Sequence, residues 1–211
     1  MIDSVQLGRR LAERHATPTE PIRFDPVRSL LNYAEAPFPG DWTLRSSLMR
    51  LAQPHPARVG QVLAHVRRLD APLHHVRRVL ERHVVVADAH LSPVTVAAEP
   101  SPSEPSAPVH DIRTADLGRL VAAGAEVDQL LAGYEAQHPL DTEERLAVPL
   151  LSVAVRVEQL AGTLSGWALT GPADPPIAAV DQFVETVGAM LDALGVPTET
   201  GPPPGMRRGR G

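Results

Sequence analysis

Three stretches in the last third of the chain carry apolar residues at alternating spacings of three and four. They are residues 117–134, 146–167 and 177–194. This spacing places the apolar residues of each stretch on one face of a helix. Asp141 followed by Glu144 resembles a capping box, and Gly195 fits the left-handed residue that ends many helices. The pattern predicts a three-helix antiparallel bundle over residues 113–195, with an internal core rather than a dimer seam.

The first 82 residues carry shorter helical patterns that prolines interrupt. We predict one helix over residues 3–14 and a second over residues 43–52. Apolar residues at helical spacing predict a third helix over residues 57–69 and a fourth after Pro72. The break is placed there because a proline inside a helix removes a backbone hydrogen bond and clashes with the preceding turn. Residues 1–82 are therefore expected to be helical between their loops.

The helical period ends at residues 83–112, where the chain turns to β-branched runs and prolines. Valines dominate residues 84–86 and 94–96, which predicts a small β-hairpin or a pair of sheet fragments. The sequence EPSPSEPSAP at residues 99–108 is too rich in proline to pack as either element and is expected to be an exposed loop. Residues 196–211 have nothing to bury and are expected to be disordered.

These elements predict one domain over residues 1–195, of the mainly α (α+β) class. The apolar content of 43% is enough to bury a core. Only 3% of residues are aromatic, so nucleic acid is not a favoured partner because base stacking needs aromatic side chains. No cysteine is present, which excludes disulfides, thiolate metal ligands and a cysteine nucleophile. We expect a cytoplasmic protein without membrane contact, because residues 146–155, the longest apolar run, are too short to cross a bilayer.

Arginine supplies all 20 basic side chains, and the chain contains no lysine. This excludes a P-loop lysine, a Schiff-base lysine and the lysine with which kinases hold ATP phosphates. Residues 1–83 hold 13 arginines against 8 acidic residues, and residues 84–211 hold 7 against 17, so the two halves should attract one another. A basic cluster is formed by Arg58, Arg67, Arg68, Arg77, Arg78 and Arg82. It is either a solvated face or a partner for the acidic half, with a polyanion as the alternative ligand.

One short segment, VADAHLSPVTV at residues 86–96, carries residue types that catalysis uses. It is similar to the catalytic loop of the aminoglycoside phosphotransferase and choline kinase superfamily, which typically reads His-Gly-Asp-x-His-x-x-Asn. The resemblance implies that Asp88 takes the proton of a substrate hydroxyl and that His90 lies beside it as a catalytic residue. It also implies that Asp111, in the strand PVHDI, binds Mg²⁺.

Flanking segments extend this resemblance over most of residues 7–195. The segment LGRRLAERHAT resembles a family helix that ends in Leu-x-x-Leu-His, with His15 in the histidine position. The segment after Tyr134 resembles the C-terminal helices, where a tyrosine is followed by a Leu-(Asp/Thr)-x-x-Glu start. Asp116 in ADLG fits the Asp-Leu-Ala that follows the metal-binding aspartate, which leaves the metal position at Asp111 open. The implied fold is the C-terminal lobe of a protein-kinase-like fold.

Several family residues are replaced in this chain. Val86 and Ala87 stand where the family has histidine and glycine, and Pro93 stands in place of the metal-binding asparagine. The nucleotide-binding lobe is expected to be missing ahead of the first helix. Phosphoryl transfer depends on a glycine-rich loop, a lysine and metal ligands that stabilise developing charge. We therefore expect a degenerate, inactive lobe that needs no cofactor, with Mg²⁺ and ATP bound only if the chain is a kinase.

The candidate residues also have structural interpretations. Asp88 is a substrate contact, a catalytic base or a turn residue that hydrogen-bonds its own backbone. His90 is a ligand or a loop histidine. A metal site of His83, Asp88 and His90 can be drawn, although its spacing fits no strong pattern.

Three functions are compatible with these features. The first is a phosphotransferase-like lobe, catalytically inactive alone, that binds a small-molecule ligand or a protein partner. The second is a helical interaction or scaffold module with no ligand site. The third is a small-molecule kinase, acting on a hydroxyl group, whose nucleotide lobe comes from a partner chain.

Overall fold

The protein is described here by a computed structural model. It describes residues 3–16, 42–80, 84–88, 91, 96, 108–169 and 174–198. Side chains are described for all of these except residues 42–46, 70, 74, 77–80, 84, 86–88 and 108–111. This part of the chain is mainly helical, as the sequence predicts, with seven helices and two strands.

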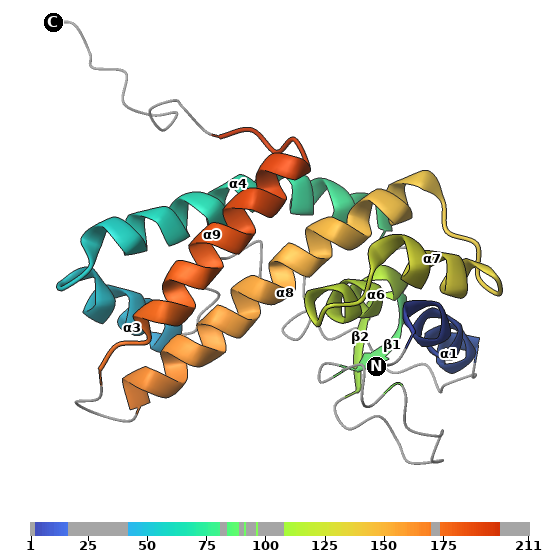
Figure 1. Cartoon of the computed structure of the whole chain (residues 1–211), viewed down its shortest axis with the longest axis horizontal. Coiled ribbons are helices and arrows are strands. Elements are labelled where there is room, and N and C mark those ends of the chain that lie inside the picture. Colours follow the sequence, from blue (N-terminus) through green and yellow to red (C-terminus); the bar gives the residue numbers. More distant parts are fainter. Residues whose placement is uncertain are drawn as a thin grey trace, which may run out of the picture.

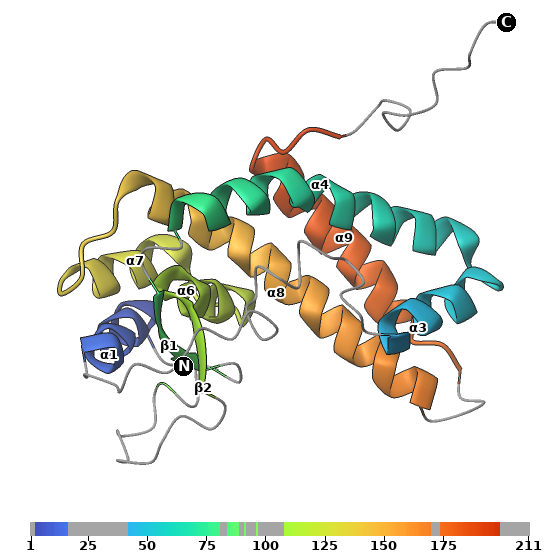
Figure 2. The same ribbon diagram turned by 180° about the vertical axis from the view of Figure 1, so that it is seen from behind.

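The elements surround one long central helix. In chain order they are α1 (Ser4–Ala16), α3 (Trp42–Ala52), α4 (Pro56–Leu80), β1 (Val84–Asp88), β2 (Pro108–Ile112), α6 (Arg113–Ala122), α7 (Val127–Glu135), α8 (Thr142–Leu169) and α9 (Ile177–Ala193). Figures 1 and 2 show α8 running through the molecule, with α3 and α9 towards its C-terminal end and α6 and α7 towards its N-terminal end. Helix α1 packs on α7, and α4 packs on α8 and α9.

The predicted capping box forms at the start of α8. The backbone N–H of Glu144 donates to Oδ1 of Asp141 at 2.8 Å, and the backbone N–H of Asp141 donates to Oε2 of Glu144 at 2.9 Å. Two of the backbone donors that a helix start leaves unsatisfied are thereby paired. The helix begins where these two residues indicate.

Two glycines end helices in the same way, and only one was predicted to do so. Gly195 (φ 67°) ends α9, where Val196 donates to the carbonyl of Leu191. Gly124 (φ 101°) ends α6 with the same bond pattern, although the apolar spacing predicts one helix through it. The three-helix bundle over residues 113–195 is therefore wrong: four helices cover this range, because glycine alone adopts a positive φ without strain.

Proline interrupts the helices less than predicted. Helix α4 continues through Pro72, where the sequence predicts two helices, and α8 continues through Pro149. Leu69, before Pro72, and Leu73 and Val76, after it, are buried in the same core. Packing on both sides of the proline holds the helix together despite the lost backbone hydrogen bond.

The two strands form an antiparallel pair. Val84 lies opposite Ile112 and Asp88 lies opposite Pro108, so β1 pairs with the strand PVHDI. Val96 is helical and packs in the second core, which corrects the prediction of a strand there, because the β propensity of a valine is weak and depends on what surrounds it. The predicted exposed loop falls outside the described residues up to position 107.

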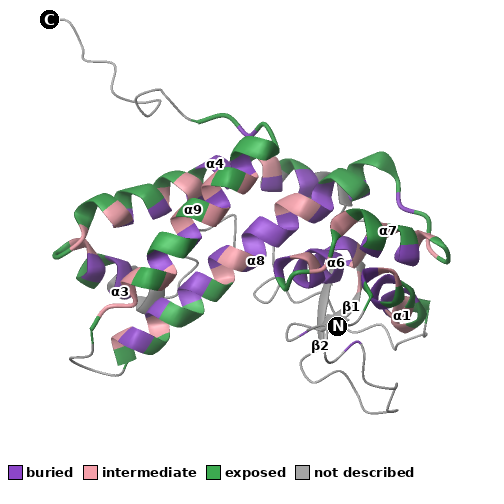
Figure 3. Ribbon diagram, in the orientation of Figure 1, coloured by how far each residue is buried: buried purple, intermediate pink, exposed green. Residues whose placement is uncertain are grey.

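The buried residues form two cores. The first core contains 26 buried residues, mostly from α3, α4, α8 and α9. The second core contains Leu7, Leu11, Ala12, Leu91, Val96, Leu117, Leu120, Leu130, Tyr134, Leu140 and Val148. Figure 3 shows buried residues along α8 from end to end, and this helix contributes to both cores. Each fully buried leucine or valine stabilises the fold by roughly 1.5–3 kcal/mol.

The structure describes the C-terminal segment three residues further than predicted, to residue 198. Val196 follows the glycine that ends α9, and its side chain is buried in the first core. Its carbonyl accepts a hydrogen bond of 2.5 Å from Nη2 of Arg68. The predicted disordered tail falls outside the described residues from position 199 onward.

Ion pairs between α4 and α9 join the basic and acidic halves of the sequence. Arg58 donates to both carboxylate oxygens of Asp181 at 2.5 and 3.1 Å, and Nη2 of Arg68 donates to Asp192 at 2.7 Å. The predicted attraction between the halves is confirmed for these two arginines. The side chains of Arg77 and Arg78, and all of Arg82, lie outside the described part of the chain.

Among the described residues, α8 alone is long and apolar enough to cross a membrane by length and composition. More than half of its most apolar window is buried inside the protein, where α3, α4, α6 and α9 cover it. Core helices of soluble proteins pass the same test, so this arrangement is compatible with a soluble protein.

Candidate functional site

Helices α1 and α7 approach each other at two glycines. A Cβ on Gly8 would overlap the carbonyl oxygen of Leu130, and a Cβ on Gly133 would overlap the carbonyl oxygen of Val5. The backbones are therefore in contact, which only residues without a side chain allow. This contact brings the C-terminal end of α1 against α6 and α7.

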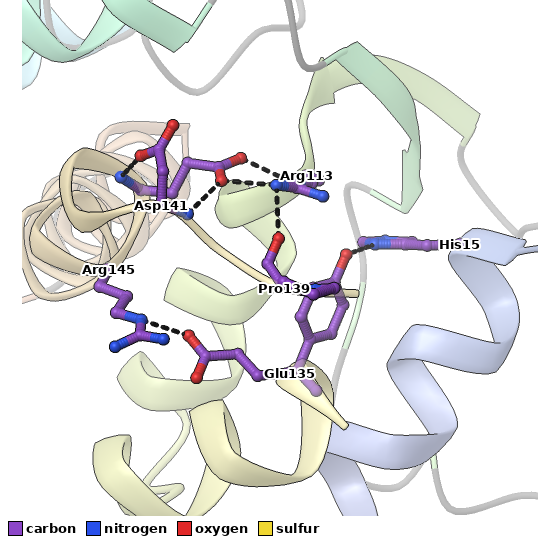
Figure 4. Close-up of polar contacts among 8 residues, drawn as sticks. His15, Arg113, Glu135, Pro139, Asp141 and Arg145 are labelled. Carbon is purple, nitrogen blue, oxygen red and sulfur yellow. Dashed lines mark hydrogen bonds and ion pairs between the residues drawn. The ribbon is translucent and has the colours of Figure 1, made fainter. Parts of the chain in front are cut away.

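Four polar residues meet at that end of α1, and we call them the histidine cluster: His15, Asp116, Arg119 and Tyr134. Nδ1 of His15 lies 2.8 Å from the hydroxyl of Tyr134, and its Nε2 lies 3.3 Å from Oδ2 of Asp116. Nη1 of Arg119 donates to Oδ1 of Asp116 at 2.7 Å. Figure 4 shows His15 reaching from α1 towards this contact. The cluster joins three helices through one imidazole ring.

The electrostatics of the cluster favour an ionised Asp116 and a protonated Tyr134. Burial on its own would raise the pKa of Asp116, but the hydrogen bond from His15 and the charge of Arg119 outweigh it and lower that pKa. Burial raises the pKa of the Tyr134 hydroxyl, so this group remains a hydrogen-bond donor. The imidazole of His15 can then donate from Nε2 to Asp116 and accept at Nδ1 from Tyr134.

A second polar contact connects the start of α6 to the cap of α8. Arg113 donates from Nε and Nη2 to the two carboxylate oxygens of Glu144, both at 2.5 Å, and from Nη2 to the carbonyl of Pro139 at 3.0 Å. Figure 4 shows Arg113 beside the Asp141 cap. The hydrogen bond to Glu144 raises the pKa of Arg113. Glu144 therefore serves the capping box and this ion pair together.

A histidine bonded to a carboxylate and a tyrosine has the residue types of a general base, but this cluster is closed. The side chains of His15, Asp116 and Arg119 are 4%, 3% and 5% exposed, and Tyr134 is fully buried. A general base must reach the proton of a substrate. The arrangement instead fixes α1 against α6 and α7, because each partner holds the others in place.

The residues predicted for catalysis lie on or beside the strand pair. Asp88 is the last residue of β1, and Asp111 is in β2, where it pairs with Val85, three positions along the ladder from Asp88. The side chains of both aspartates, and His90 altogether, lie outside the described part of the chain. Their roles stay predictions.

No group of three or more His, Asp or Glu side chains that could hold a metal ion occurs among the described residues. The predicted Mg²⁺ ligand Asp111 and the sketched His83 site fall outside that set. The magnesium site therefore stays a prediction as well.

The resemblance singles out His15, Asp116 and Tyr134, and the structure brings these three together. Arg119 was missed, although its position three residues after Asp116 is a spacing at which helical side chains meet. Arg113 was also missed. Its partner Glu144 is 31 positions away, and no local pattern connects them.

Comparison of the chain with protein-family models, with curated proteins and with solved structures finds no match.

Proposed function

We propose that the chain is a phosphotransferase-like helical lobe that does not transfer phosphate on its own and acts by binding a small ligand or a protein partner. The observation that carries the proposal is the meeting of His15, Asp116 and Tyr134. Each lies in a segment that resembles the superfamily, and Asp116 and Tyr134 follow His15 by 101 and 119 positions along the chain. Chance resemblances in separate segments would have no reason to converge.

The position of the histidine cluster supports the same proposal. Strand β2 ends at Ile112, and α6 begins at the next residue, so the strand that carries Asp111 leads directly into the helix that carries Asp116. Helix α6 also packs on both strands, so a buried network on that helix holds the strand pair in place. The cluster would then support a binding surface around Asp88 without taking part in it.

The residues present argue against catalysis. Pro93 offers no side-chain ligand where the superfamily has asparagine, and the absence of lysine removes the usual cation for ATP phosphates. Removing a single stabilising donor can lower a rate by about 10²–10³. Several such losses together leave binding as the remaining role.

Titration with ATP and Mg²⁺, followed by calorimetry and an assay of ATP consumption, tests the inactive state. We expect no heat of binding and no phosphate transfer to amino sugars or amino alcohols, the substrates that the resemblance implies. Saturable ATP binding with turnover would contradict the proposal and favour a small-molecule kinase.

Thermal unfolding in the presence of the same amino sugars and amino alcohols tests ligand binding. We expect one class to raise the melting temperature, and the shift to disappear in Asp88→Asn. Asp128→Asn is the matched control, because Asp128 is an exposed aspartate on α7. An equal shift in both variants would remove any role for Asp88.

A helical scaffold without a ligand site is the second candidate. The observation that favours it is the closed histidine cluster, whose side chains bond to one another and are almost wholly buried. Absence of any thermal shift, together with unchanged stability of Asp88→Asn, would favour this function over the first.

A further inference from the structure

A hollow of ≈ 170 Å³ lies between α8 and α9, away from the strand pair and the histidine cluster. Each helix lines the hollow with four residues, at positions i, i+3, i+4 and i+7. Residues at these positions lie on one face of a helix. Figure 1 shows the two helices side by side along this seam. The hollow is too small for a nucleotide cofactor, because cofactor pockets measure about 300–1,000 Å³.

Among the residues that the structure describes, Arg156 is the single charged side chain that lines the hollow. Its Nε atom is buried, and the described residues provide no hydrogen-bond partner for it. The other arginine of α8, Arg145, is paired with Glu135 at 2.5 Å. A buried guanidinium N–H without an acceptor is unfavourable, since it has lost water and gained nothing in return. Arg156 therefore carries a donor for which the described residues supply no acceptor.

The remaining lining combines hydrogen-bonding side chains with an apolar floor. Gln159 and Gln182 carry amide donors, and Thr186 carries a hydroxyl. The hydroxyl of Thr163 already donates to the carbonyl of Gln159 at 3.0 Å. Phe183 provides apolar surface, and no carboxylate of the described part of the chain lines the hollow. Hydrogen-bond donors around one guanidinium, beside an apolar surface, suit an oxoanion that carries a short apolar group.

We propose that the groove between α8 and α9 binds a small organic oxoanion, a carboxylate or a phosphate ester, through the guanidinium of Arg156. Two oxygens of the anion accept from the guanidinium, and the apolar part lies against Phe183. The amides of Gln159 and Gln182 bond the outer side of the anion. This site is separate from the surface around Asp88, so the result of its test does not depend on the proposed function.

Titration of the full chain, followed by nuclear magnetic resonance of its backbone amides and arginine Nε–H groups, tests the site. The probes are sodium butyrate for a carboxylate and methyl phosphate for a phosphate ester, with sodium chloride at matched ionic strength as the control. We expect saturable shifts at millimolar concentration in residues 156–163 and 182–186. The Nε–H resonance of Arg156 should move with them, because its guanidinium binds the anion.

Arg156→Gln should weaken binding about tenfold or more, because a charge-assisted hydrogen bond is lost. The matched control is Arg145→Gln, which removes an arginine from the same helix and should leave the affinity unchanged. If Arg156→Gln does not fold, Gln182→Ala, at an exposed position, and the wild-type Nε–H resonance give the same information.

Saturation by one probe supports the site and identifies its anion class, and saturation by both supports an oxoanion site without selectivity. The proposal is overturned if neither probe saturates, if chloride produces the same shifts, or if Arg156→Gln binds as well as the wild-type chain.

Discussion

The two ends of α8 lie in cores of different chemistry. Its C-terminal half packs with α3, α4 and α9 around the first core, where the buried polar side chains of α3, α4 and α8 are Ser47, Arg68 and Ser152. Near its N-terminal end, Val148 joins the second core, which borders the buried side chains of Asp116 and Arg119. An apolar core tolerates substitutions that conserve volume, whereas a buried polar group needs its own partner. Substitutions near the two ends of α8 should therefore destabilise the protein for different reasons.

Asp116→Ala should lower the free energy of unfolding more than any other change at either end of α8. It leaves Arg119 and His15 buried without their carboxylate, which costs about 3–5 kcal/mol in the free energy of unfolding. Urea unfolding followed by circular dichroism measures the loss. Asp128→Ala, at an exposed position of α7, is the control and should change stability by less than about 0.5 kcal/mol. Equal losses in the two variants would mean that the second core does not depend on its charges.

Gly133→Ala should have the next largest effect, because the new Cβ would overlap the backbone at Val5. We expect a loss of about 1–3 kcal/mol, the usual cost of overpacking, concentrated in α1. Hydrogen exchange should show faster exchange in α1, while α4 and α9 keep their protection. Gly162→Ala is the control, since a Cβ there meets nothing within 4 Å, and it should not destabilise the protein. Uniform loss of protection would contradict a local role for the glycine contact.

A smaller, pH-dependent effect is expected in the first core, at His65. Burial, and then the nearby charge of Arg68, lower the pKa of His65 below its ordinary value of 6.5, against opposing contributions from the Val184 carbonyl and Asp192. The unfolded chain therefore binds the proton more tightly, and stability should fall as the pH drops below about 6.5. Urea midpoints at pH 7.5 and pH 5.5 measure this loss.

His65→Gln should flatten that part of the pH profile, whereas His75→Gln, at an exposed position of the same helix, should leave it unchanged. The pKa of Asp116 is lowered as well, so its contribution has the same sign but a different window: it stabilises the fold above about 3.8 and is lost at lower pH. Because the two pH ranges differ, the loss of stability at His65 can be measured separately from the loss at Asp116. An unchanged profile in His65→Gln would assign the loss to other groups.

Arg58→Gln should have the smallest effect. Arg58 and Asp181 are 40% and 48% exposed, so water and salt screen their attraction. We expect a urea midpoint close to that of the wild-type protein at low salt, and no difference at 1 M salt. Arg68→Gln is the informative comparison, because Arg68 is buried and also donates to the carbonyl of Val196. A larger loss in Arg58→Gln than in Arg68→Gln would contradict this order.

Local signals in the sequence predict local structure well in this chain. Asp141 and Glu144 mark the start of α8 because both partners of the capping box are three residues apart. Gly124 was misassigned because the apolar spacing continues on both sides of it, and a glycine fits both a helix face and a helix end. Pro72 was misassigned for the opposite reason: its local rule predicts a break, and packing of distant helices overrides it.

The candidate site was harder to predict because its contacts join distant segments. The contact between His15 and Asp116 spans 101 positions, and no spacing rule reaches so far. Only the resemblance singled out both residues, and it assigned them no contact. The glycine approach between Gly8 and Gly133 was also invisible, since it depends on how two helices cross.

Helix α8 contributes buried side chains to both cores, so the protein cannot easily be divided between them. Its 28 residues extend for about 42 Å without a break. A cut anywhere within it would leave each fragment with an open apolar face and no means to close it. Neither end of the protein should be obtainable as a separate folded piece, and a protease should find α8 the last place at which it can cleave.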